Sequence, residues 1–265
     1  MGSIEQDLET PAEVQGDKVV VGAWSKDLIE VAREAARIRA LLAEGQAEEA
    51  RREMQSRSTE EKAALVLISP EGQEDLLSLT GPGGRSYSPA VVDRLPTEVL
   101  VSLLAVDSEY LKHNVELLRA MSPERFGRAV ADTLEPVDHP EARQKVAWEW
   151  LEAMAEVDDV THRMRLLAAV DIDLIEDALF SIVDQLNLNT VVFAIHGLPP
   201  VKRFRLFSEL GVGGSPPSTF IENLEIGKVL DALWEATPDL FKHAIRGAWE
   251  RRSDADGEPE DADEG

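Results

Sequence analysis

The stretch Met121-Ser122-Pro123-Glu124-Arg125 sets a hydroxyl, a proline and a carboxylate in a row just before an apolar segment. A serine hydroxyl caps the first turn of a helix, a proline fits its first position, and the helix dipole favours a carboxylate there. The pattern predicts an all-α fold, an irregular superhelix built from short helical hairpins. Related starts occur at Ser58-Thr59-Glu60, Ser69-Pro70-Glu71, Leu95-Pro96-Thr97-Glu98, Asp107-Ser108-Glu109 and His139-Pro140-Glu141.

Capping residues and apolar periodicity predict where the helices begin and end. Ser25 is expected to cap the first helix and Gly45 to end it, while Ser58 and Glu61 have the spacing of a capping box. Residues 190–195 are apolar and β-branched, so a helix and a buried strand both remain open there. The predicted helices span residues 25–44, 47–55, 58–68, 70–79, 89–95, 96–106, 108–121, 123–134, 141–170, 172–187, 199–210, 218–235 and 238–251.

The distribution of charge predicts how the chain is divided. Residues 1–17 carry five acids and no base, and residues 253–265 carry seven acids and no base, so both ends are expected to be disordered. Between them we expect a helical-repeat superhelix over residues 18–135 and a continuing helical domain over residues 136–252. The glycine-rich breaks at 80–84 and 211–217 lack the Lys-Ser/Thr pair of a phosphate loop and are interpreted as linkers.

The composition excludes several classes of function. With 51 acidic and 27 basic residues the formal net charge is −24, which disfavours nucleic acid and anionic membranes as partners. There are no cysteines, so disulfides, thiolate catalysis and cysteine metal sites are excluded. No apolar run approaches the roughly 20 residues of a membrane-spanning helix. These features predict a soluble cytoplasmic protein of bacterial type that does not insert into membranes.

The helical starts follow one another at irregular intervals, unlike the periods of about 34 and 40 residues in tetratricopeptide and armadillo arrays. Over residues 41–135 the chain resembles the cytoplasmic N-terminal domain of MgtE-type magnesium transporters, and more distantly the middle domain of the flagellar motor switch protein. The resemblance implies an armadillo-like superhelix that regulates or docks. The matching pieces are Leu41-Leu42-Ala43-Glu44-Gly45, Ser69-Pro70-Glu71, Arg94-Leu95-Pro96-Thr97-Glu98 and Met121-Ser122-Pro123-Glu124-Arg125.

One acidic stripe is a candidate metal site. Glu152, Glu156, Asp159 and His162 follow one another at spacings of four, three and three, which places them on one face of a continuous helix. Clustered oxygen ligands suit hard cations such as Mg²⁺. The competing interpretation is a solvated acidic face. A second acidic group, at residues 171–177, lacks the central glycine of an EF-hand loop and is interpreted as the cap of a new helix.

The sequence therefore favours a non-enzymatic scaffold or regulatory adaptor that binds a protein partner. Four tryptophans are candidate partner anchors, because tryptophan is over-represented at interface hot spots; core packing is the alternative for each. A divalent-cation-responsive module is the competing function, and a helical-bundle enzyme is a third. No cofactor is expected apart from Mg²⁺ at the stripe. The tryptophans are Trp148, Trp150, Trp234 and Trp249.

Overall fold

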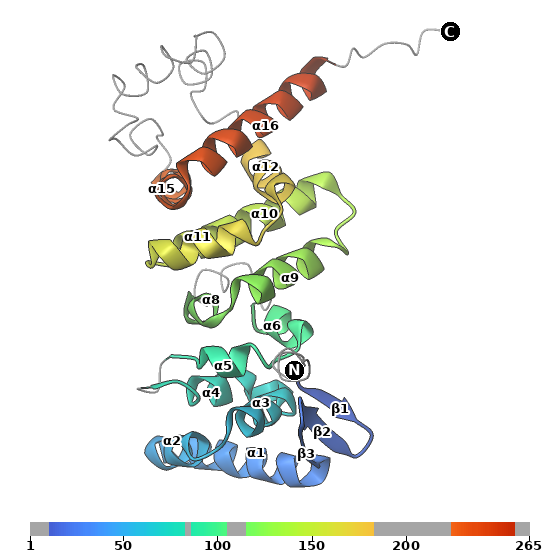
Figure 1. Ribbon diagram of the computed structural model, residues 1–265, viewed down its shortest axis with the longest axis vertical. Helices are drawn as coiled ribbons and strands as arrows, with labels where there is room; N and C mark the ends of the chain where they lie inside the picture. Colours follow the sequence, from blue (N-terminus) through green and yellow to red (C-terminus); the bar gives the residue numbers. More distant parts are fainter. Residues whose placement is uncertain (1–10, 83–85, 105–114, 183–223, 258–265) are drawn as a thin grey trace, which may run out of the picture. The chain divides into compact units, whose positions relative to one another are not determined.

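The computed structural model describes residues 11–82, 86–104, 115–182 and 224–257 (Figure 1). These residues are mostly helical, as the sequence predicts. The chain divides into two compact units, Met1–Asp132 and Thr133–Gly265. Among the described helices, none combines the length and the apolar character that crossing a bilayer requires.

Unit 1 begins with a three-stranded antiparallel sheet in the order β1-β2-β3, formed by Glu13–Gln15, Lys18–Val21 and Trp24–Asp27. Gly16 and Gly22 begin the two tight turns with φ of 62° and 57°, which glycine adopts without steric cost. In β2, Val19 and Val21 are buried. The prediction of disorder through residue 17 is therefore wrong for β1, and the predictions for residues 1–10 lie outside the described residues.

The first helix, α1, spans Leu28–Ala43 rather than beginning at Ser25. Ser25 lies in β3, and the Asp27 carboxylate caps the helix by accepting hydrogen bonds from the N–H groups of Ile29 and Glu30. At the other end Gly45 is the stop, as predicted. Its φ is 76°, and the N–H groups of Gly45 and Gln46 donate to the carbonyls of Leu42 and Leu41, which closes the helix in a Schellman motif.

The helix α3 lies in the core of the N-terminal part of unit 1, and its residues 63–66 are buried in succession. Neighbours contact α3 on several sides, namely α1, α4, α5 and β2. Its predicted capping box is confirmed: the Ser58 hydroxyl accepts from the Glu61 N–H, and the Glu61 carboxylate accepts from the Ser58 N–H. The helices after α1 are α2 (Ala47–Gln55), α3 (Thr59–Leu67), η1 (Pro70–Gly72), α4 (Gln73–Ser78), α5 (Pro89–Val92), α6 (Thr97–Leu104), α8 (Val115–Ala120) and α9 (Pro123–Leu134), the last of which ends in unit 2.

The predicted helix over 70–79 is instead a 3₁₀ turn, η1, followed by α4. The Ser69 side chain makes no capping hydrogen bond to η1, so the expected serine cap is wrong at this position. Gly72 separates the two pieces. An added Cβ at Gly72 would lie 2.8 Å from the Nε atom of Arg39, so this glycine lets α1 and the start of α4 approach each other.

Unit 2 contains α10 (Pro140–Ala155), α11 (Val160–Ala168), α12 (Ile172–Phe180), α15 (Leu224–Ala236) and α16 (Pro238–Gly257). The long helix expected over 141–170 is divided in two, because α10 ends at Ala155, Val157 turns inward and is buried, and Asp159 caps α11. The helix α16 continues past the predicted end into the acidic tail as far as Gly257. Predictions for residues 190–195, 199–210 and 211–217 lie outside the described residues.

Candidate protein-interaction surface

The helix α1 has a buried side and an exposed side that differ in chemistry. Val31, Ala35 and Ile38 are buried, which fixes the helix on the core of unit 1. Ala36, Ala40 and Ala43 are exposed and recur at spacings of four and three, so they share one strip of the helix surface. Other exposed positions of α1 include the charged Arg33 and Arg37, but also Ile29, which is 61% exposed. The alanine strip is therefore one apolar part of a mixed exposed face.

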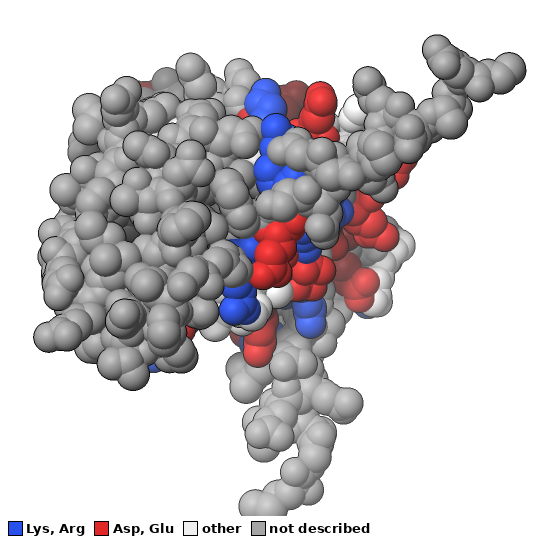
Figure 2. All heavy atoms as spheres, turned by 90° about the horizontal axis from the view of Figure 1, so that it is seen from above, with Lys and Arg blue, Asp and Glu red and all other residues white. Residues whose placement is uncertain are grey.

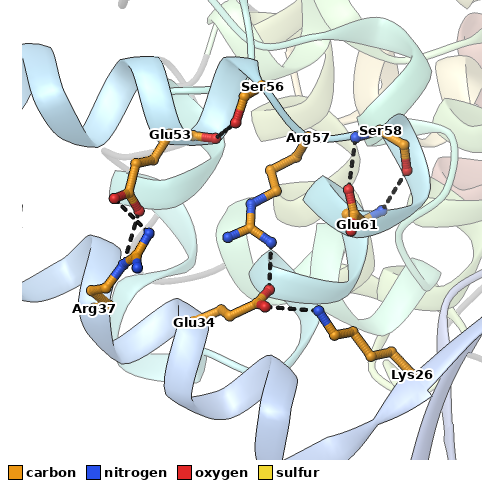
Figure 3. Close-up of polar contacts among 8 residues, drawn as sticks. All are labelled: Lys26, Glu34, Arg37, Glu53, Ser56, Arg57, Ser58 and Glu61. Atoms are coloured by element: carbon orange, nitrogen blue, oxygen red, sulfur yellow. Dashed lines mark hydrogen bonds and ion pairs between the residues drawn. The ribbon is translucent and has the colours of Figure 1, made fainter.

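Ion pairs attach α1 to the elements around it (Figure 3). The Glu34 carboxylate lies between the Lys26 ammonium, at 2.7 Å, and the Arg57 guanidinium. Burial raises the pKa of Glu34, but the hydrogen bond from Lys26 and the charges of Arg57 and Lys26 outweigh it, so the pKa of this carboxyl is lowered. One carboxylate thus joins β3, α1 and the turn before α3.

A second ion pair joins α1 to α2 (Figure 3). Two nitrogens of the Arg37 guanidinium approach the two carboxylate oxygens of Glu53, at 2.6 and 3.1 Å. This forked geometry restricts the orientation of both groups more than a single contact does. Together with the Glu34 pairs, it fixes α1 on the side of the helix that faces α2 and α3.

The helix α4 is held at its C-terminal end by a side chain from α2. The Gln55 amide nitrogen lies 2.7, 3.0 and 3.2 Å from the carbonyl oxygens of Leu79, Thr80 and Gly81. These carbonyls lie at the end of the helix, where the backbone leaves acceptors without helical partners. The amide therefore occupies the helix end and positions α4 relative to α1 and α2.

Between α1 and the η1–α4 segment lies an open hollow of about 680 Å³. Its volume falls within the range of roughly 300–1,000 Å³ typical of ligand sites. The α1 side is largely apolar and the η1–α4 side is polar. We call this feature the α1–α4 hollow; it is lined by Ala36, Arg39, Ala40, Leu42, Ala43, Glu71, Asp75 and Ser78.

The charged side chains that line the α1–α4 hollow are at least partly exposed, and we call them its rim. The Arg39 guanidinium approaches the Glu71 carboxylate at 3.7 Å, with 40% and 88% of the two side chains exposed. An exposed pair of this kind contributes about 0–1 kcal/mol. Asp75 is also exposed, and no described lysine or arginine lies within ion-pair distance of it. The rim therefore keeps a carboxylate accessible next to the exposed alanine strip, which we call the floor of the hollow.

The residues of the predicted metal stripe do not share a helix. Glu156 ends α10 and pairs with Lys228 of α15 at 2.5 Å. The Asp159 side chain accepts a hydrogen bond from the backbone N–H of His162, which lowers the pKa of Asp159, and so it caps the next helix. Glu152 remains on α10. Within the described ranges, no group of three or more His, Cys, Asp or Glu side chains is placed to hold a metal ion.

The second acidic group does begin a helix, as predicted. Asp171 caps α12 by accepting a hydrogen bond from the Asp173 N–H. The following carboxylates are neutralised by arginines from other helices: Arg251 of α16 contacts Asp173, Glu176 and Asp177 at 3.0, 2.9 and 2.8 Å. Arg143 of α10 contacts Asp177 at 3.0 Å. On the face shown in Figure 2, Lys and Arg side chains likewise lie among Asp and Glu side chains.

The candidate tryptophan anchors differ in accessibility. Trp150 is 2% exposed and belongs to the core of unit 2, whereas Trp148 is half-buried. Trp234 is also half-buried; its ring packs edge-to-face on Phe241 at 5.6 Å, and the Lys242 ammonium lies 5.4 Å from its centroid. The side chain of Trp249 lies outside the described residues. The structure therefore leaves Trp148 and Trp234 as partly accessible aromatic surfaces.

The α1–α4 hollow was not anticipated from the sequence. The available signal was the recurrence of alanine along one strip of a helix whose other exposed positions include charged residues. The second wall could not be inferred, because its position depends on the tertiary packing of η1 and α4 against α1.

Comparisons with known proteins give no relatives for this chain: no protein-family model, no curated protein and no solved structure matches it. The resemblance to the MgtE N-terminal domain therefore stays a prediction based on the residues quoted above.

Proposed function

We propose that this protein is a non-enzymatic scaffold or regulatory adaptor that binds a protein partner through an exposed helical surface. The observation that supports it is the α1–α4 hollow, which combines an apolar floor with a polar, charged rim. Interfaces commonly have this composition, with an apolar centre surrounded by polar groups. The irregular superhelix suggested by the resemblance to the MgtE domain is part of the proposal, as the architecture that would present such surfaces.

The side-chain contacts that hold the two walls of the hollow also support docking. Ion pairs from Glu34 and Arg37 fix α1, and the Gln55 amide fixes the end of α4. A preformed surface loses less conformational entropy on binding than a mobile one, so more of the contact energy contributes to affinity. The exposed alanines lose no side-chain rotamer freedom when they are covered.

The test begins with the full-length chain carrying an affinity tag, purified from its source cells. Candidate partners found by quantitative mass spectrometry are purified, and complex formation is measured by sedimentation velocity. We expect at least one to form a complex of defined stoichiometry. If no purified candidate binds the chain, the proposed function is wrong.

A paired substitution then locates the binding surface. Ala40→Gln places a long neutral side chain on the floor of the hollow, while Ala168→Gln makes the same change at an exposed position of α11. Both positions are helical and solvent-facing, so both variants are expected to fold. We expect Ala40→Gln to weaken the complex about tenfold or more, through overlap with the partner, and Ala168→Gln to leave it unchanged.

A further inference from the structure

The residues that line the α1–α4 hollow indicate the chemistry of a binding partner; this inference rests on the proposed function. Three alanines and the half-buried Leu42 form the apolar part of its α1 side, and among the residues that the structure describes no long apolar side chain fills the space. The occupant must therefore supply the apolar volume. An amphipathic helix laid into a groove between helices supplies such side chains along one face.

The rim of the hollow determines the sign of the occupant's charge. Arg39 lies against Glu71, so the arginine is already engaged with one carboxylate. Asp75 stands on the opposite wall from the alanine strip and has no described cation at ion-pair distance. The charged lining residues, Arg39, Glu71 and Asp75, thus have a net negative charge, and a cation on the occupant would gain an ion pair that none of the described residues provides.

Tyr87 gives a separate indication that the field around α4 is negative. The pKa of Tyr87 is raised to about 12, first by burial of the phenol and then by the carboxylates of Glu74, Glu116 and Asp75. Each of these carboxylates disfavours formation of a phenolate. A charge that repels a phenolate attracts an ammonium or a guanidinium.

A second copy of this chain is a poor occupant for the same reason. Each chain carries a formal net charge of −24, so two copies repel each other at long range. A basic partner would instead be attracted to the whole molecule and then bind at the rim.

We propose that the α1–α4 hollow binds a basic amphipathic helix of a partner protein, with apolar side chains over the alanine strip and a lysine or arginine at Asp75. The affinity therefore depends on ionic strength and on the sign of the charge at position 75.

The probes are two synthetic amphipathic helical peptides with the same apolar face, one with lysine and one with glutamate along the polar face. Binding to the full-length chain is measured by fluorescence anisotropy at low and high salt. We expect the lysine peptide to bind and the glutamate peptide to bind at least about tenfold more weakly. Higher salt should weaken the binding of the lysine peptide, because exposed charges are screened.

Charge reversal tests the position. Asp75→Lys is compared with Glu49→Lys, which reverses an exposed acid in the first turn of a different helix, α2. Both variants change the net charge of the chain equally, so the comparison isolates the local effect. We expect Asp75→Lys to lower the affinity for the lysine peptide about tenfold and to raise the affinity for the glutamate peptide. Glu49→Lys should change both affinities by less than about twofold. Circular dichroism and urea unfolding verify that each variant is folded.

Several outcomes would overturn the inference. They are failure of the lysine peptide to bind, equal binding of both peptides, equal effects of the two charge reversals, and self-association of the chain that Ala40→Gln abolishes. None of these affects the proposed function if a purified partner still forms a complex. Failure of every purified candidate to bind, with the lysine peptide still bound at Asp75, would instead overturn the proposed function alone.

Discussion

Gly247 of α16 lies directly against the carboxylate of Glu176 on α12, so closely that an added Cβ would overlap the Oε1 atom. The other oxygen of the same carboxylate, Oε2, accepts from the Arg251 guanidinium at 2.9 Å. Glu176 is 8% exposed. The close approach of the two helices and the neutralisation of a nearly buried charge thus occur at the same place.

Gly247→Ala is therefore expected to destabilise the protein, although alanine is the better helix former. Overpacking of this kind costs about 1–3 kcal/mol, which exceeds the gain in helix propensity of roughly 1 kcal/mol. Urea unfolding of unit 2 measures the change. In a double-mutant cycle with Glu176→Ala, the loss of stability in the double variant should be smaller than the sum of the two single losses. The reason is that Glu176→Ala removes the atoms that the added methyl group would overlap. Strict additivity would contradict this packing.

Arg251 is expected to be the most important cation of α16, because it contacts three carboxylates of α12. Arg251→Gln leaves the negative charges of Asp173, Glu176 and Asp177 close together with one cation fewer to neutralise them. We expect the free energy of unfolding to fall by about 1–2 kcal/mol. The matched control is Arg246→Gln, which removes an exposed pair with Glu250 at 3.8 Å and should change stability by less than about 0.5 kcal/mol. Equal losses for both arginines in thermal unfolding would exclude the proposed role of Arg251.

Glu34 gives unit 1 a predictable dependence on pH. Its pKa is lowered from 4.5 in the folded protein, so the folded state holds the carboxylate more strongly ionised than the unfolded chain does. The stabilisation is present above pH 4.5 and is lost as the pH falls through the lower pKa that Glu34 has in the folded state.

Glu34→Gln should therefore reduce the loss of stability between pH 5 and more acidic solutions, as measured by urea unfolding at a series of pH values. The comparison variant is Glu49→Gln, an exposed glutamate of α2. An unchanged pH dependence in Glu34→Gln would show that Lys26 and Arg57 do not stabilise the ionised form.

Magnesium ions are expected to leave the thermal stability unchanged. The four stripe residues are divided between α10 and α11, with Glu156 and Asp159 engaged by Lys228 and by the His162 N–H. A ligand that binds only the folded state raises its melting temperature. Melting curves with and without millimolar MgCl₂, at constant ionic strength, test this. A rise of several degrees that Glu152→Gln abolishes would restore the cation-responsive hypothesis.

Local signals in the sequence were sufficient wherever the controlling chemistry is local. The helices over 47–55 and 123–134 have the predicted bounds, and the Ser58–Glu61 capping box and the Gly45 stop are present. Each of these depends on residues within one or two turns. The division between α10 and α11 was missed because no glycine or proline marks it. Asp159, a good capping residue, was instead counted as a ligand on a continuous helix.

Features that depend on distant residues were not predictable in the same way. The sheet was missed because its strands are short and the acids around Glu13 indicate solvent, while burial of Val19 and Val21 depends on α3 and α1. The α1–α4 hollow has the same origin. Ala40 and Asp75 are separated along the chain, and the packing of α4 on α3 and α1, together with its contact with Gln55, brings the two walls together.

The pairing of Arg251 with Asp173 spans 78 positions of the chain and has a consequence for synthesis on the ribosome. Unit 1 is a compact unit of 132 residues, and compact units of this size can fold while the rest of a chain is still being translated. Asp173 and Glu176 of α12 are translated well before Arg251 of α16, the cation that contacts both of them. Premature termination within α16 would therefore leave a folded first unit attached to an incomplete, strongly anionic second one, which is a ready substrate for cellular proteases.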